Sequence, residues 1–128
     1  MAKLHIEATE RSPEIDFDFD SGKLAIKGES YPEDIIAFFG PVNEKLETYL
    51  SSLNGGDVEV NFELIYFNSS STKILIGMFD SFDEAAERGN DVTINWRYDE
   101  DDDTMEELGE EFAEDLEYAT FNMVKVAD

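Results

Sequence analysis

The sequence contains no cysteine and only one histidine, His5, among its 128 residues. Disulfides, thiolate catalysis and cysteine-ligated zinc are therefore excluded. With one histidine and no cysteine, the chain cannot by itself assemble a histidine-based transition-metal site or a Ser-His-Asp triad. The sequence also shows no glycine-rich phosphate-binding loop. Its glycine pair, Gly55-Gly56, is typical of a turn.

Basic residues are few: nine lysines and arginines stand against 32 aspartates and glutamates, which gives a formal net charge of −23. So acidic a surface repels phosphate backbones and anionic lipid headgroups, so we expect no nucleic-acid or membrane partner and favour basic protein surfaces. Solubility or a salty habitat explains the charge equally well. The sequence has no segment long and apolar enough to span a bilayer, and its N-terminus lacks the apolar run of a signal peptide, so we expect a cytoplasmic protein.

Apolar residues, in contrast, occur in the proportion of a folded protein, with 41% hydrophobic and 12% aromatic residues. They recur with the periods of strands and helices, which favours a folded domain over disorder despite the high charge. The length is that of one domain, and neither an internal repeat nor a linker is visible. We expect a single domain spanning residues 1–128.

Strands are predicted wherever apolar and polar residues alternate. They cover residues Leu4–Ala8, Glu14–Asp20, Lys23–Gly28, Val58–Phe67, Val92–Tyr98 and Thr120–Val126. A turn at Asp20-Ser21-Gly22 joins the second and third strands into a hairpin. In the strongest strand the alternation predicts one shared face for Val58, Val60, Phe62, Leu64 and Tyr66.

Helices are predicted between the later strands, where apolar residues recur at helical spacing. Capping boxes at Ser30–Glu33 and Thr104–Glu107 predict the starts of the first and third helices. The pair Gly40-Pro41 is expected to kink the first helix or divide it in two. Gly89 is well placed as the left-handed cap that ends the second helix.

This order of elements predicts an α/β fold with a mixed sheet, in which an N-terminal hairpin precedes right-handed crossover units with parallel strands. Strands that helices cover on both faces are apolar throughout. The strands at residues 58–63 and 92–98 alternate instead. We therefore expect the helices to pack mainly on one face and the other face to be polar or partly open.

Acidic motifs give little support for a metal site. The segment Asp16–Gly22 resembles the start of an EF-hand loop, but Ser21 and Lys27 stand where that loop needs glycine and glutamate. The run Asp99–Asp103 has no ligand spacing and is typical of a solvated loop. Carboxylate pairs are too abundant to single out, and no nucleophile–base pair can be named. We expect no catalytic residue, no metal and no cofactor.

Four consecutive hydroxyl residues follow the strongest strand, at Ser69–Thr72. This position, between the carboxyl end of a strand and the start of a helix, is where open α/β sheets meet ligands and partners. One interpretation is that Ser69 or Ser70 caps the helix and the others are ordinary loop residues. The other is a phosphorylation site, because a phosphate would face backbone N–H groups and the positive end of the helix. On sequence alone the two interpretations weigh about equally.

The segment Leu64–Lys73, with Ser30–Glu33 upstream and Trp96–Asp99 downstream, resembles the SiaC family of bacterial regulatory phosphoproteins. The likeness runs from the Asp18–Gly28 hairpin to the predicted helix around Glu110–Phe112. It implies a STAS-like fold, as in anti-sigma-factor antagonists, and regulation by partner switching. A serine/threonine kinase of the anti-sigma type would phosphorylate the loop and a PP2C-type phosphatase would reverse this. The unphosphorylated form would bind and activate a diguanylate cyclase, raising cyclic di-GMP and favouring biofilm formation.

Carried onto this chain, the resemblance places the phosphoacceptor directly after Asn68, at Ser69, with Ser70 as the second candidate. The family position can be threonine, so serine is a mild departure. The partner-binding loop would consist of Asn68, Ser69, Ser70, Ser71, Thr72 and Lys73. The alternative function is a constitutive interaction or scaffold domain of the same fold, whose partner affinity would not change when Ser69 becomes aspartate.

Overall fold

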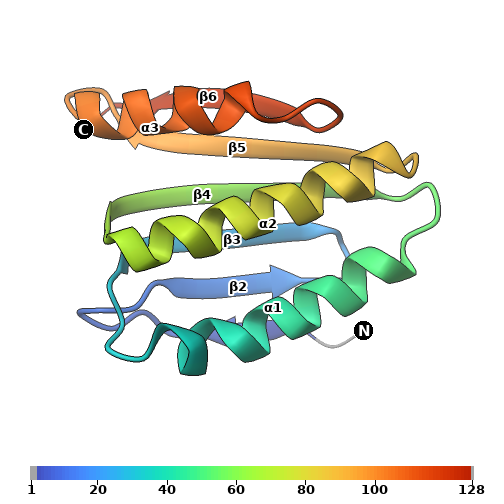
Figure 1. The fold of residues 1–128 in the computed structure, drawn as a ribbon, viewed down its shortest axis with the longest axis horizontal. Helices are drawn as coiled ribbons and strands as arrows, with labels where there is room; N and C mark the ends of the chain where they lie inside the picture. The colour runs from blue at the N-terminus through green and yellow to red at the C-terminus, as the bar shows by residue number, and fades with distance from the viewer. Residues whose placement is uncertain (1–2, 128) are drawn as a thin grey trace.

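The computed structural model describes residues 3–127 and shows a six-stranded sheet with three helices (Figure 1). The strands are β1 (Leu4–Ile6), β2 (Glu14–Asp18), β3 (Lys23–Ser30), β4 (Asp57–Phe67), β5 (Asp91–Asp99) and β6 (Thr120–Val126). The helices are α1 (Ile35–Ser52), α2 (Ser69–Glu87) and α3 (Asp103–Glu114). The predicted mixed α/β fold is confirmed.

The strands lie in the sheet in the order in which they occur in the chain. β1, β2 and β3 pair antiparallel, whereas β3, β4, β5 and β6 pair parallel. Each helix therefore connects one parallel strand to its next neighbour in the same direction. Connections of one hand that always step in the same direction place every helix on the same face. Figure 1 shows α1, α2 and α3 on one face of the sheet, as predicted.

The core lies between the helices and this covered face. Along β5, Val92, Ile94 and Trp96 are buried, while the residues between them are half-buried on the other, open face. Trp96 is 1% exposed and its indole Nε1 donates a hydrogen bond to the backbone oxygen of Met105, 2.9 Å away. Because alternate side chains of a strand point to opposite faces, the alternating sequence has produced one apolar and one polar face.

The open face is held by side-chain hydrogen bonds and ion pairs. Asn95 donates to Asn61 over 3.1 Å and accepts from Asn122 over 3.0 Å, so an asparagine ladder crosses β4, β5 and β6. Glu63 pairs with Arg97 at 2.9 Å and with Lys27 at 3.5 Å. The hydrogen bond from Arg97 is the main reason why the pKa of Glu63 lies below its ordinary value. Positive charge is therefore used to balance acidic residues on this face.

Two helix starts differ from the prediction. Ser30 does not cap α1, because it still pairs with Phe67 as the last residue of β3; the N-cap is Asp34, which accepts from the backbone N–H of Ala37. The N-cap of α3 is Asp102 rather than Thr104. In both places an aspartate near the first apolar residue of the helix takes the capping position.

The structure bears on two predictions made at glycines, a left-handed helix end at Gly89 and a kink or break at Gly40-Pro41. Gly89 has a φ of +101° directly after Arg88, the C-cap of α2, so the prediction of a left-handed residue at this helix end is confirmed. Gly40 and Pro41 lie inside α1, which is one continuous helix and is not divided. A third glycine, Gly109 of α3, lies against the sheet, where an added β-carbon would collide with the indole ring of Trp96. The absence of a side chain at Gly109 lets α3 pack closely on the sheet.

Candidate functional site

The expected hydroxyl loop is in fact the first turn of α2. Asn68 is the N-cap, and its Oδ1 accepts a hydrogen bond from the backbone N–H of Ser71 at 3.0 Å. Neither Ser69 nor Ser70 caps the helix, which corrects the interpretation of these serines as capping residues. Asparagine is among the residues most favoured at N-caps, so the residue type was a usable signal for this role.

Ser71 is an internal residue, with 1% of its surface exposed. Its hydroxyl donates to the backbone oxygen of Ser30 at 2.9 Å and lies 2.8 Å from the Ser30 hydroxyl. The Ser30 oxygen also accepts from the backbone N–H of Asn68. Ser71 therefore attaches the start of α2 to the end of β3, and it does not belong to the surface that a partner could contact, contrary to the expected loop.

Only two of the four hydroxyl residues are exposed, Ser69 and Ser70. Thr72 is half-buried and its hydroxyl donates to the backbone oxygen of Asn68 at 3.2 Å. The structure therefore divides the segment into two residues that hold the helix start together and two whose hydroxyls face solvent. Both the expected phosphoacceptor and the second candidate are in the second group.

The electrostatics of this helix start differ from those of the other two. The N-caps of α1 and α3 are the acidic residues Asp34 and Asp102, and the first turn of α3 contains further acidic residues. The N-cap of α2 is neutral, and its first turn contains no acidic residue. A doubly negative group is stabilised at a helix N-terminus but repelled by nearby carboxylates. Of the three helices, α2 is the one whose start best accepts a phosphate.

Lys73 adds a positive charge beside this helix start. It follows Ser69 by four residues, and side chains at this spacing lie on the same face of a helix. Lys73 is exposed and has no ion-pair partner among residues 3–127. In a chain with 32 acidic residues, an unpaired lysine at this position is available to a phosphate on Ser69.

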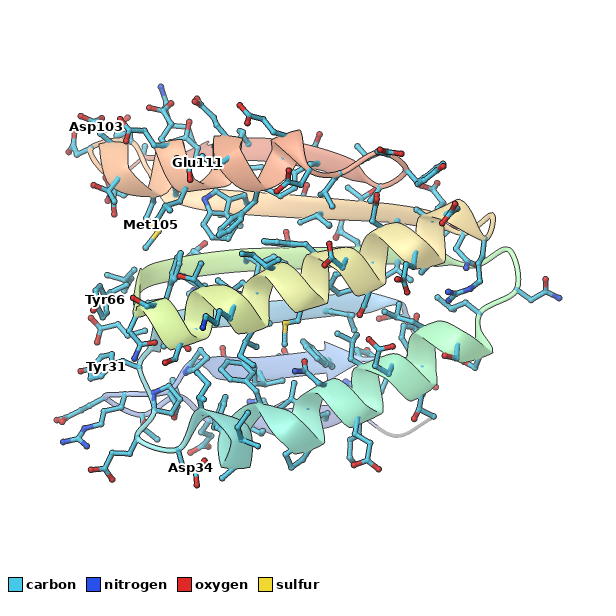
Figure 2. The ribbon with its side chains drawn as sticks, viewed as in Figure 1. Tyr31, Asp34, Tyr66, Asp103, Met105 and Glu111 are labelled. Carbon is cyan, nitrogen blue, oxygen red and sulfur yellow. The ribbon has the colours of Figure 1, made fainter. Side chains whose placement is uncertain are left out.

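Two tyrosines lie at the same edge of the molecule (Figure 2). The rings of Tyr31 and Tyr66 meet edge to face, with centroids 5.7 Å apart. The prediction that Tyr66 shares the buried face of β4 is wrong. The pairing of β3 with β4 skips Ile65, a β-bulge that leaves Ile65 and Tyr66 exposed and turns Phe67 into the core. Alternation alone cannot reveal a bulge, because the extra residue reverses the pattern beyond it.

Acidic residues do not gather into a metal site in the part of the chain that is described: residues 3–127 contain no group of three or more potential metal-binding side chains. Within the same residues, no helix has the length and apolar character needed to cross a membrane. His5 lies 3.4 Å from Glu14 on the sheet, far along the chain from α2.

Comparisons with known proteins agree on one family. A family model described as SiaC family regulatory phosphoprotein matches residues 6–126. An uncharacterized protein of Pseudomonas aeruginosa (strain UCBPP-PA14) is 36% identical over 118 residues, which cover 92% of this chain and 93% of that protein.

Solved structures are similar over almost the whole chain. The crystal structure of apo-SiaC from Pseudomonas aeruginosa has a TM-score of 0.85 at 34% identity and covers 97% of this chain and 99% of that one. The structure of the diguanylate cyclase SiaD in complex with its activator SiaC, from the same organism, has a TM-score of 0.90 at 34% identity, with 96% and 99% covered.

Proposed function

This chain belongs to the SiaC family of regulatory phosphoproteins, and from that premise we propose that it is a partner-switching regulator controlled by phosphorylation of Ser69. In the unphosphorylated form it binds and activates a diguanylate cyclase, as the SiaC of Pseudomonas aeruginosa is described to activate SiaD. It acts as a binding protein in the cytoplasm and not as an enzyme.

The main support for this proposal is that the residues that stabilise the start of α2 are not the residue proposed to be phosphorylated. Asn68 caps the helix and Ser71 is buried, so the exposed hydroxyl of Ser69 is not needed for folding. A kinase can therefore phosphorylate it without breaking a structural hydrogen bond. The phosphate would be stabilised by the helix dipole and by Lys73, and it would change the charge, size and hydration of the surface beside Tyr66.

A serine/threonine kinase of the anti-sigma type and a PP2C-type phosphatase are the proposed enzymes of the cycle. The kinase transfers the γ-phosphoryl group of ATP to the Ser69 oxygen, releasing ADP and the hydroxyl proton. The phosphatase hydrolyses the ester with water and returns serine and inorganic phosphate. The exposed position of Ser69 is compatible with access by both enzymes.

Phosphopeptide mapping tests the acceptor. The chain is co-expressed with the anti-sigma-type kinases of its source genome and analysed by mass spectrometry, together with Ser69→Ala and, as the matched control, Ser70→Ala. We expect one phosphate, which Ser69→Ala removes and Ser70→Ala retains. A phosphate that persists in Ser69→Ala and disappears in Ser70→Ala would transfer the switch to Ser70.

A cyclase assay tests the activation. Cyclic di-GMP synthesis by each diguanylate cyclase of the source genome is measured with and without the purified chain. We expect one cyclase to be stimulated by the chain and by Ser69→Ala, but not by the chain phosphorylated at Ser69. Equal stimulation by phosphorylated and unphosphorylated chain would indicate a constitutive interaction domain instead.

A further inference from the structure

The sheet divides in two at the end where the helices begin. The ladder between β4 and β5 stops at the pair Phe62–Trp96, although β4 continues to Phe67 and β5 to Asp99. Over these last residues β4 stays paired with β3, and β5 stays paired with β6. The two halves separate toward the start of α2, as Figure 1 shows. The parallel sheet therefore opens at its carboxyl end.

A cleft of about 560 Å³ occupies this opening. Its apolar lining includes Leu64 and Ile65 from β4 and Val126 from β6. Acidic residues Asp101 and Asp102, which precede α3, also line it. The volume falls within the range of about 300 to 1,000 Å³ that is typical of binding pockets. The cleft thus combines an apolar wall with negative charge.

The basic residue in the cleft forms an ion pair with an acidic residue. Arg97 also lines it, but its Nε donates to Glu63 at 2.9 Å, and Lys27 approaches the same carboxylate. The lining contains one basic residue, Arg97, against the acidic residues Glu63, Asp99, Asp101 and Asp102, so its net charge is negative. A ligand with a negative group would meet net repulsion here, whereas a lysine or arginine would be attracted.

Exposed apolar residues lie beside the cleft because of the β-bulge. Ile65, which lines the cleft, is 69% exposed, and Tyr66, the next residue in the chain, is 50% exposed. Single exposed apolar residues are common on protein surfaces, but two consecutive ones beside a pocket are less so, and tyrosine is enriched among the residues that anchor interfaces. β-bulges often lie next to functional sites, where they re-aim side chains.

We propose that this cleft, together with the exposed side chain of Tyr66 next to it in the chain, is the docking surface for the cyclase, and that it takes an apolar side chain flanked by lysine or arginine. The inference rests on the proposed function. The apolar wall matches the apolar side chain, and the acidic wall and the net charge of −23 match the basic neighbours. A second copy of this chain is a poor occupant, because it would bring the same negative charge.

Ser69 is close enough to this surface to act on it. It follows Tyr66 by three residues, so their α-carbons are at most about 10 Å apart. A phosphate there adds negative charge, which does not oppose the approach of a basic partner. It does place a strongly hydrated group beside an apolar contact, where desolvation is costly. Phosphorylation is therefore expected to speed dissociation of the complex without slowing association.

Matched serine substitutions test the docking surface. Binding of the cyclase that the unsubstituted chain activates is measured by surface plasmon resonance. The test variants are Ile65→Ser and Tyr66→Ser. Their controls are Ile36→Ser, which removes an isoleucine with the same 69% exposure on α1, and Tyr118→Ser, which removes a tyrosine that is 54% exposed. Circular dichroism and thermal unfolding establish that each variant is folded.

We expect Ile65→Ser and Tyr66→Ser each to weaken binding about tenfold or more, as truncation of interface anchors does, and the controls to change it less than about twofold. Asp101→Asn should slow association and reduce its dependence on salt. Full binding by both test variants, or a loss with Ile36→Ser as large as that with Ile65→Ser, would overturn the docking surface. Failure of every cyclase to bind the unsubstituted chain would instead overturn the proposed function.

Discussion

Within strand β5, neighbouring residues belong to two different environments. Trp96 is 1% exposed on the covered face, in contact with the aromatic rings of Phe62 and Phe112, whereas Arg97 lies on the open face and pairs with Glu63. Burial of a large aromatic side chain contributes several kcal/mol to stability, but a partly exposed ion pair contributes less than about 1 kcal/mol. The covered face therefore holds the fold together and the open face tolerates change.

The same contrast occurs at the start of α2, over two residues of sequence. Ser71 is buried and hydrogen-bonded to Ser30, whereas Ser69 is exposed. A regulated hydroxyl has to lie in the second environment, because a phosphate in the first would disrupt the core. Burial and hydrogen bonding of the hydroxyl group therefore distinguish a structural serine from a serine that can be modified.

Among the variants that test the contrast between the two faces, Trp96→Ala is expected to have the largest effect on stability. It should lower the free energy of unfolding by about 3 to 5 kcal/mol, because it removes a buried aromatic side chain and leaves a cavity. Arg97→Ala, the matched change on the other face, should cost less than about 1 kcal/mol. Urea unfolding followed by circular dichroism measures both, and equal losses would contradict the contrast between the faces.

The next largest loss of stability is expected from removal of a carboxylate on α2, one of the helices that cover the sheet. Asp83 of α2 accepts hydrogen bonds from the backbone N–H groups of Glu117, Tyr118 and Ala119, at distances from 2.8 to 3.3 Å. Asp83→Ala leaves these donors without their charged acceptor and should cost about 2 kcal/mol. Asp80→Ala, at an exposed position of the same helix, is the control. Equal stability of the two variants would contradict the role of Asp83.

The same carboxylate predicts a dependence on pH. Burial acts to raise the pKa of Asp83, but the hydrogen bonds from the three backbone N–H groups outweigh it and hold that pKa below its ordinary value. Its contribution to stability is therefore complete above the unfolded pKa of about 3.9 and is lost as the pH falls through the lower folded pKa. Asp83→Asn should therefore reduce the loss of unfolding free energy that occurs as the pH falls below about 3.9, measured by chemical denaturation at several pH values. The same loss in Asp83→Asn as in the unsubstituted chain would contradict the prediction.

A smaller effect is expected at the start of α2. Ser71→Ala removes the hydrogen bond to the backbone oxygen of Ser30 and should cost about 1 kcal/mol. Ser69→Ala should change stability by less than about 0.5 kcal/mol, as is usual for an exposed residue. Thermal unfolding of the two variants measures the difference. If Ser69→Ala were the more destabilising, Ser69 would have a structural role and the separation of the two serines would fail.

The smallest effect should come from the asparagine ladder of the open face. Asn95→Ala removes two side-chain hydrogen bonds, one to half-buried Asn61 and one to exposed Asn122, and should cost about 0.5 to 1 kcal/mol. Asn122→Ala, at the end of the ladder, should cost less because it removes one. Chemical denaturation with closely spaced points can resolve the two, and a loss close to that of Trp96→Ala would show that the open face also stabilises the fold.

Much of this fold could be predicted from periodicity. Alternation in β4 and β5 indicated that one face of the sheet is polar and that the helices pack on the opposite face. The order of the elements indicated parallel strands. These features depend on patterns that repeat along many residues, so a single exception does not hide them. Gly89 was equally predictable, because a left-handed helix end favours glycine for steric reasons.

The details of the site were less predictable. The bulge at Ile65 reverses which of the following residues is buried, and the pairing of β3 with β4 rather than a local motif determines it. The capping box at Ser30 failed for a similar reason, since Ser30 was retained in β3 by its pairing with Phe67. The burial of Ser71 depends on its contact with Ser30, 41 residues earlier in the chain. Such contacts are tertiary, and one sequence does not reveal them.

The most direct test of the switch uses phosphoserine placed at a single position during synthesis of the full chain, which needs no knowledge of the kinase. Affinity for the activated cyclase is measured for the chain with phosphoserine at 69, with phosphoserine at 70, and without phosphate. We predict that phosphoserine at 69 weakens binding about tenfold or more, mainly through faster dissociation, and that phosphoserine at 70 has a smaller effect. Unchanged affinity with phosphoserine at 69 would contradict the account.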